Sequence, residues 1–176
     1  MPRLKTIDPT TDTGAGADLL NGPLKAKQIN IFKGLAAHAP VLQAFMGWAG
    51  GSKGGALTPA EGEVVQLLSA EKMHCDYCLA AHTMIAQGTG LSEDDCVNIR
   101  KRQSDDPKMQ VLIDFTAETL DTYGNVSDET LAEFMDAGFN TEAAIEVVAG
   151  ISVMTFTSLY NHINDTTVDF PEVSAV

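Results

Sequence analysis

Apolar residues recur at roughly helical spacing along most of the chain. They do so over residues 25–37, and Pro40 then opens a second helix through Phe45 and Trp48 that ends in the glycine-rich segment 50–55. The segment from 141 to about 162 is apolar nearly all the way round. Its β-branched residues leave room for a strand, but some twenty residues without a turn signal fit a buried helix better.

Polar residues mark where further helices begin and end. Thr58 as N-cap, Pro59 at the first helical position and Glu61 to complete a capping box predict a helix from 59 to about 72. The same logic indicates three more starts, at Ser92 with Asp95, at Asp106 before Pro107, and at Ser127. Three glycines stand where helices should stop: Gly90, Gly124 and Gly138.

These patterns predict an all-α protein. At 176 residues the chain has the size of one domain with a real core. Residues 1–22 show no helical or strand period, so we expect an irregular N-terminal arm followed by one helical domain over 23–176. We predict a compact bundle of about seven or eight helices without a sheet. A helix that is apolar all round needs partners on several sides, which favours an oligomer.

Charge and cysteine content narrow the function classes. The net charge is −13, and the eleven Lys and Arg residues are scattered, so nucleic acid is not an expected partner. The N-terminus lacks the apolar core of a secretory signal, and no stretch approaches the ~18 uninterrupted apolar residues of a membrane span. We therefore expect a cytoplasmic protein with no membrane partner. Two of its three cysteines form Cys-x-x-Cys, a spacing that in a reducing compartment suggests redox or metal chemistry.

Cys75, Cys78 and His82 are the main candidates for chemistry. If residues 75–89 are helical, the three side chains fall within an arc of about 60°. The two sulfurs can then close a disulfide across one turn, and the imidazole can reach Cys78 from the next turn. A thiolate is the reactive form of cysteine, and His82 as a base and the helix N-terminus near Cys75 would favour it. Such a pair suits a thiol peroxidase, whose sulfenic acid a neighbouring thiol resolves.

Glu63 is a fourth candidate. It shares a stripe with apolar residues of the preceding helix, so its carboxylate should be at least partly buried and in need of a partner. With a pKa raised by burial, it could pass protons to and from His82 or a cysteine. A carboxylate in the first turns of a helix can also be just a favourable charge there.

Other interpretations of the same residues stay open. Cys75, Cys78, His82 and a carboxylate would make a plausible zinc set, although three ligands from one helix are unlike the turns of zinc knuckles. Cys96 is most simply a small buried hydrophobe. Tyr77 beside the cysteines fits packing or a hydrogen bond, and the role of His74 is open because it abuts Cys75.

The complete pattern resembles a known family. It consists of Glu63, eleven residues, Cys75-Asp76-Tyr77-Cys78, three residues and His82. It is similar to the alkylhydroperoxidase D-like branch of the carboxymuconolactone decarboxylase superfamily, specifically over residues 58–100. The founding alkylhydroperoxidase has a histidine where this chain has Tyr77, so one member of its proton relay is absent.

The resemblance implies an all-helical protein that assembles as a homotrimer or homohexamer and reduces organic hydroperoxides. It further implies that Cys78 is peroxidatic, that Cys75 resolves, and that Glu63 and His82 relay protons. We therefore expect a cysteine-based peroxidase without haem, flavin or metal, whose partners are a hydroperoxide and a thiol reductant. The alternatives are a general thiol-disulfide oxidoreductase or redox sensor, and a non-enzymatic zinc-binding structural module.

Overall fold

The computed structural model describes residues 1–176 and is entirely helical, as predicted. Nine α-helices and one 3-10 turn follow one another along the chain: α1 (Ala15–Asn21), α2 (Asn30–Leu35), η1 (Ala36–His38), α3 (Ala39–Gly51), α4 (Pro59–Lys72), α5 (Asp76–Gly88), α6 (Glu93–Arg100), α7 (Pro107–Thr122), α8 (Asp128–Asp136) and α9 (Thr141–Asn164). The prediction of seven or eight helices is thus low by one or two. All the helix starts predicted from capping residues are found within one residue of their expected positions.

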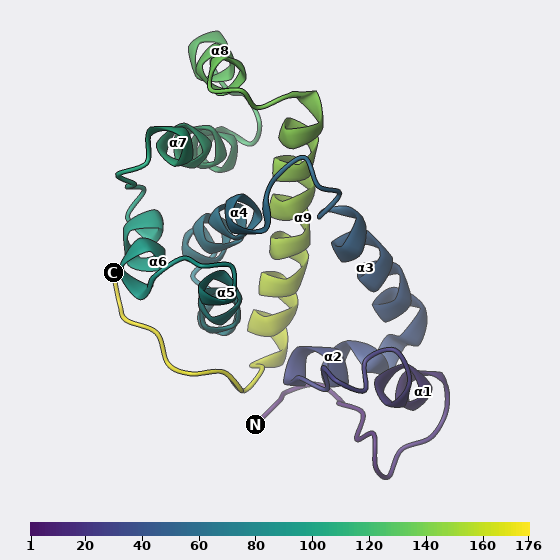
Figure 1. The fold of residues 1–176 in the computed structure, drawn as a ribbon. Coiled ribbons are helices and arrows are strands. Elements are labelled where there is room, and N and C mark those ends of the chain that lie inside the picture. The colour runs from purple at the N-terminus through teal and green to yellow at the C-terminus, as the bar shows by residue number, and fades with distance from the viewer.

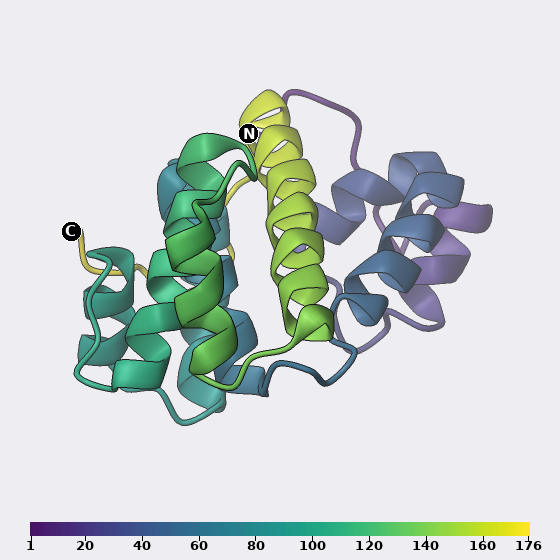
Figure 2. The ribbon, with the colours of Figure 1, turned by 90° about the horizontal axis from the view of Figure 1, so that it is seen from above.

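Helix α9 is the central element of the fold. Figures 1 and 2 show it between α1–α3 on one side and α4–α8 on the other. It contributes Val147 to an apolar core built with α4, α6, α7 and α8, and Val153 and Met154 to a second core built with α1–α3 and the start of α5. By length and composition α9 would also pass as a membrane-crossing helix, but a helix packed between two cores fits a core helix of the bundle better.

The residues around α4 and α5 show why these helices begin where they do. Thr58 Oγ accepts the Glu61 N–H at 3.2 Å, and the Glu61 carboxylate accepts the Thr58 N–H at 2.8 Å, which completes the expected capping box. Helix α5 begins at Asp76, because Cys75 is its N-cap and has extended backbone. The expected helix over 75–89 is therefore one residue shorter at each end.

Two expectations for the N-terminal part were wrong in detail. The segment 1–22 contains α1, whose Leu20 is fully buried, and at Gly16 any side chain would collide with the Ala36 carbonyl. The helix expected over 25–37 begins only at Asn30. Its first N–H bonds the carboxylate of Asp169 in the C-terminal tail at 2.8 Å, so a residue far away in the sequence fixes this boundary.

The core between α9 and helices α4, α6, α7 and α8 contains a stack of three aromatic rings. Phe134 lies between Phe115 and Phe139, with ring centroids 4.1 and 4.5 Å away, and its side chain is completely buried. We expect Phe134→Ala to lower the free energy of unfolding by about 3–5 kcal/mol, because it removes buried area and leaves a cavity. Denaturant unfolding measures this. Met135→Ala, on the same helix but 44% exposed, should change the free energy of unfolding by less than about 0.5 kcal/mol. Equal effects of the two substitutions would contradict the placement of Phe134 in the core.

Candidate active site

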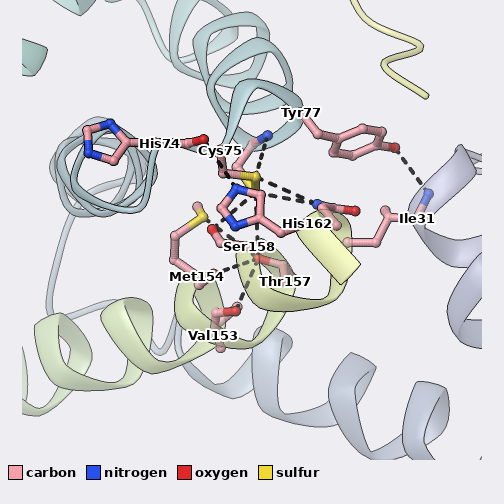
Figure 3. Close-up of a disulfide and its surroundings, with 11 residues drawn as sticks. Ile31, His74, Cys75, Tyr77, Val153, Met154, Thr157, Ser158 and His162 are labelled. Atoms are coloured by element: carbon pink, nitrogen blue, oxygen red, sulfur yellow. Dashed lines mark hydrogen bonds between the residues drawn. A yellow bond between two sulfur atoms is a disulfide. The ribbon is translucent and has the colours of Figure 1, made fainter. Parts of the chain in front are cut away.

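Cys75 and Cys78 form a disulfide at the start of α5 (Figure 3). Their Cα atoms are 5.2 Å apart, within the range a disulfide requires. The Cys75 sulfur also accepts the backbone N–H of Cys78 at 3.3 Å, so it occupies the capping position at the positive end of the helix. Both residues are buried, with 1% and 3% of their surface exposed.

The face of α9 that lies against the disulfide is polar. The Asn161 amide nitrogen is 3.5 Å from the Cys78 sulfur and 3.9 Å from the Cys75 sulfur. Ser158 Oγ lies 3.4 Å from the Cys78 sulfur, and Thr157 Oγ lies 4.0 Å from it. Three hydrogen-bonding side chains of α9 therefore lie around the disulfide.

The sequence analysis overlooked these α9 residues because it treated residues 141–162 as an apolar segment. A signal was present, since Thr157, Ser158 and Asn161 are separated by one and three residues and so share one side of a helix. Polar residues grouped on one side of an otherwise apolar helix indicate a buried polar contact.

Glu63 on α4 and His82 on α5 form a second pair. Glu63 Oε2 and His82 Nδ1 are 2.6 Å apart, and the Lys53 ammonium lies 3.2 Å from the other carboxylate oxygen. The Glu63 side chain is 2% exposed, that of His82 20%, and that of Lys53 58%. A cavity of about 230 Å³ borders Glu63 and Lys53 beside the loop that joins α3 to α4.

The Glu63 carboxylate differs from the expectation in its acidity. Burial alone would raise its pKa, as the sequence analysis assumed, but the hydrogen bond and charge of His82 and the charge of Lys53 outweigh burial and bring the pKa below its ordinary value. Glu63 is therefore an ionised partner for His82 at neutral pH.

The structure thus arranges the four candidate residues as two pairs, Cys75 with Cys78 and Glu63 with His82. No hydrogen bond joins His82 to either sulfur, and its Nε2 has no partner in the protein. The proposed zinc set does not gather either, because no group of three or more Cys, His, Asp or Glu side chains has a metal-binding arrangement.

Tyr77 points away from the sulfurs (Figure 3). Its hydroxyl accepts the backbone N–H of Ile31 at 3.2 Å, and its ring meets Phe170 edge-on with centroids 5.4 Å apart. Burial, together with the neighbouring Asp169 carboxylate, raises the pKa of Tyr77. Tyr77 connects α5 to α2 and to the C-terminal tail, which is a structural contact.

This contact predicts the effect of Tyr77→Phe. The variant leaves a buried N–H of α2 without an acceptor and should cost about 1–3 kcal/mol of unfolding free energy. The rate of disulfide formation with peroxide should not change. Thermal unfolding and stopped-flow kinetics measure the two quantities, and Tyr123→Phe, at a residue 95% exposed, is the control. A slower reaction without loss of stability would place Tyr77 in the chemistry.

The two remaining candidates, Cys96 and His74, lie at positions that fit a structural role. Cys96 is a free, buried cysteine, and burial raises the pKa of its thiol. His74 is exposed and adopts a left-handed conformation just before Cys75, with φ 52°. Its carbonyl oxygen lies 3.2 Å from His162 Nε2, so His162 holds the turn that leads into α5 (Figure 3).

Comparison with known proteins agrees with this architecture. Residues 39–113 match the model of the carboxymuconolactone decarboxylase family, and no curated protein matches the chain. The structure is similar to the alkylhydroperoxidase AhpD core of an uncharacterized peroxidase-related protein from Ralstonia eutropha JMP134, with a TM-score of 0.84, 16% identity, and 96% and 92% of the two chains covered.

Two further solved structures share the fold. An uncharacterized peroxidase-related protein from Silicibacter sp. TM1040 has a TM-score of 0.70 at 18% identity, with 94% of each chain covered. The debrominase Bmp8 has a TM-score of 0.68 at 18% identity, with 80% of this chain and 76% of that chain covered.

The chain thus combines a match to the carboxymuconolactone decarboxylase family with the helical fold of an alkylhydroperoxidase AhpD core. The family match covers residues 39–113, and the fold over nearly the whole chain is that of the AhpD-core structure.

Proposed function

We propose that the protein is a cysteine-based peroxidase that reduces organic hydroperoxides through Cys75 and Cys78. The observation that carries the proposal is the bonded cysteine pair at the start of α5, with His82 one turn further along the same helix and hydrogen-bonded to Glu63 of α4. Peroxidase-related proteins among the structures of the same fold support it. The site of action we propose is the cytoplasm, where thiol reductants are abundant.

The chemistry balances with one hydroperoxide and two thiols per turnover. The Cys78 thiolate attacks the terminal oxygen of the hydroperoxide, and the O–O bond breaks to give Cys78 sulfenic acid and, with one proton, an alcohol. The Cys75 thiol then attacks the Cys78 sulfur, forming the disulfide and releasing water. A thiol reductant returns both cysteines to the reduced state and becomes a disulfide itself.

Glu63 and His82 would manage the protons of these steps. The carboxylate holds Nδ1 of His82, which leaves Nε2 as the ring nitrogen that can accept a proton from a cysteine and return it to the leaving alcohol. An ionised Glu63 would stabilise the imidazolium formed in between. The cavity beside Glu63 and Lys53 would connect this pair with solvent.

A thiol-disulfide oxidoreductase is the second candidate. It is favoured by the position of the Cys75 sulfur at the N-terminus of α5, where the backbone N–H of Cys78 and the helix dipole stabilise a thiolate. In that reaction Cys75 would attack a disulfide of a protein substrate. The debrominase Bmp8 shares the fold, so proteins with this fold are not restricted to peroxide substrates.

The deciding experiment is the intact mass of the reduced protein before and after one equivalent of an organic hydroperoxide, with peptide mapping. The proposal expects a loss of two hydrogens at Cys75 and Cys78. A protein that is oxidised by a disulfide substrate but not by the hydroperoxide would support the second candidate instead. Stepwise oxygen addition at Cys96 alone would contradict both.

We also propose that the protein is a homo-oligomer, a trimer or hexamer, that uses α9. Ile145, Val148, Leu159 and Ile163 lie on one side of α9, and each is at least 50% exposed. We expect Leu159→Glu to reduce the assembly to smaller species in sedimentation velocity, because it buries a charge in an apolar contact. Tyr123→Glu, a substitution at an exposed aromatic residue, should leave the assembly intact. An unchanged assembly in both variants would exclude this face.

A further inference from the structure

Asn161 is a buried amide whose side chain has no partner except the redox pair. The residue is 4% exposed, and its nitrogen contacts both sulfurs. Its side-chain oxygen is buried without any hydrogen-bond partner. A buried polar group with an unmade hydrogen bond costs stability, so packing alone does not account for an asparagine at this position.

Ser158, on the same helix, also contacts the Cys78 sulfur. It is completely buried one turn before Asn161, and its hydroxyl lies 3.4 Å from the Cys78 sulfur. Serine hydroxyls in helices commonly bond the carbonyl four residues earlier, as Ser69 on α4 bonds Val65. Ser158 has the Cys78 sulfur as its partner instead, so two neighbouring side chains of α9 are directed at one sulfur.

These contacts matter because the sulfur of Cys78 is buried. A thiolate in an apolar environment is unfavourable unless hydrogen bonds or charges compensate for lost water. No charged side chain donates a hydrogen bond to either sulfur. His82 is bonded to Glu63, Lys53 also reaches Glu63, His162 bonds the His74 carbonyl, and the Tyr77 hydroxyl accepts from Ile31. The donors available to Cys78 come from neutral groups of α9.

We propose that Asn161 and Ser158 are catalytic groups that stabilise the Cys78 thiolate by donating hydrogen bonds to its sulfur. In the reduced protein the Asn161 amide N–H and the Ser158 hydroxyl would hold the negative charge before it attacks the hydroperoxide. This inference rests on the proposed function for its catalytic meaning. Its physical content, the ionisation of Cys78 and the reducibility of the disulfide, can be measured without any peroxide.

The first measurement is the pH at which Cys78 ionises. In a Cys75→Ser, Cys96→Ser background Cys78 is the only thiol, and its rate of alkylation by iodoacetamide reports the thiolate fraction. Asn161→Leu should move the midpoint upward by about one pH unit, since a hydrogen bond to a charged group is lost. Ser158→Ala should move it in the same direction, and Asn161→Asp further still, because it adds a negative charge.

The matched control is Asn164, the other buried asparagine of α9. Its amide bonds the backbone of Leu4 and the Thr166 hydroxyl, and it makes no contact with sulfur. Asn164→Leu should lower the unfolding temperature but leave the ionisation midpoint of Cys78 unchanged. This comparison separates loss of a buried amide from loss of a donor to the thiolate.

The second measurement is the redox equilibrium of the Cys75–Cys78 pair in a thiol–disulfide buffer, with Cys96→Ser as the reference protein. Without the Asn161 donor the reduced form is less stable, so the disulfide should be favoured about tenfold more, a shift of about 30 mV to more negative potential. Ser158→Ala, which only removes an atom, serves if Asn161→Leu does not fold.

An unchanged ionisation midpoint of Cys78 and an unchanged redox equilibrium in folded variants would overturn the inference. Shifts in both with no reaction toward hydroperoxide would instead refute the peroxidase proposal alone.

Discussion

Replacing the Cys78 sulfur by oxygen, in Cys78→Ser, is expected to lower peroxide turnover by more than about 10³-fold. A serine hydroxyl at this position cannot supply the polarizable thiolate that attacks the O–O bond, and no disulfide with Cys75 can form. The protein should still fold, because a serine side chain is only slightly smaller than a cysteine side chain. Asn161 and Ser158 can also form hydrogen bonds with the new hydroxyl. Turnover is measured with an organic hydroperoxide and excess dithiol.

Two further cysteine variants test whether Cys78, and not Cys75 or Cys96, reacts first with the hydroperoxide. Cys75→Ser should still react once, and Cys78 should then gain one oxygen because the resolving thiol is missing. Cys96→Ser should retain full activity, since Cys96 is buried elsewhere and forms no disulfide. If Cys75→Ser loses the first reaction and Cys78→Ser keeps it, the roles of the two cysteines are reversed.

The second large effect is expected for Glu63→Gln, which should slow turnover by about 10²-fold or more, the usual contribution of acid–base assistance. Glutamine keeps the shape of the side chain but removes the negative charge that orients His82 and stabilises its protonated form. Steady-state kinetics measure the loss. Glu61→Gln is the matched control, because Glu61 is also buried on α4 but caps the helix and pairs with Lys108. Equal rates in Glu63→Gln and the original protein would make the Glu63–His82 pair purely structural.

The same variant should change the acid sensitivity of the fold. Because the pKa of Glu63 in the folded protein is below its ordinary value, the carboxylate contributes stability above the pKa it has when unfolded. That contribution disappears as the pH falls through the folded pKa. The difference in unfolding free energy between the original protein and Glu63→Gln should therefore shrink between neutral pH and about pH 3. A constant difference would mean that Glu63 is not ionised.

The sequence predicted those helix boundaries that depend only on residues close to the boundary. The start of α4 follows from Thr58, Pro59 and Glu61, because a capping box involves only neighbours in the sequence. Helices end just before Gly90, Gly124 and Gly138, as predicted, and all three glycines adopt positive φ. The start of α2 could not be predicted, because Asp169 from the other end of the chain binds its first N–H.

In the candidate site, too, the sequence determined some contacts and the tertiary structure decided the others. Cys75 and Cys78 are close because they are three residues apart, so the sequence alone determined that they can pair. The sequence also determined that the protein is helical and that Glu63 needs a partner. The tertiary structure decided which partner, because His82 was expected to reach Cys78 and is bonded to Glu63 instead.

The surroundings of the sulfurs and the acidity of Glu63 were likewise decided only by the tertiary structure. Asn161 and Ser158 reach Cys78 across about eighty residues of chain, and this contact exists only once α9 packs against α5. Burial of Glu63 was predictable, but the sign of its pKa shift depends on Lys53 and His82 arriving from two other segments. Spacing along a helix fixes neighbours within about two turns, whereas burial, charge and hydrogen-bond partners depend on which helices pack together.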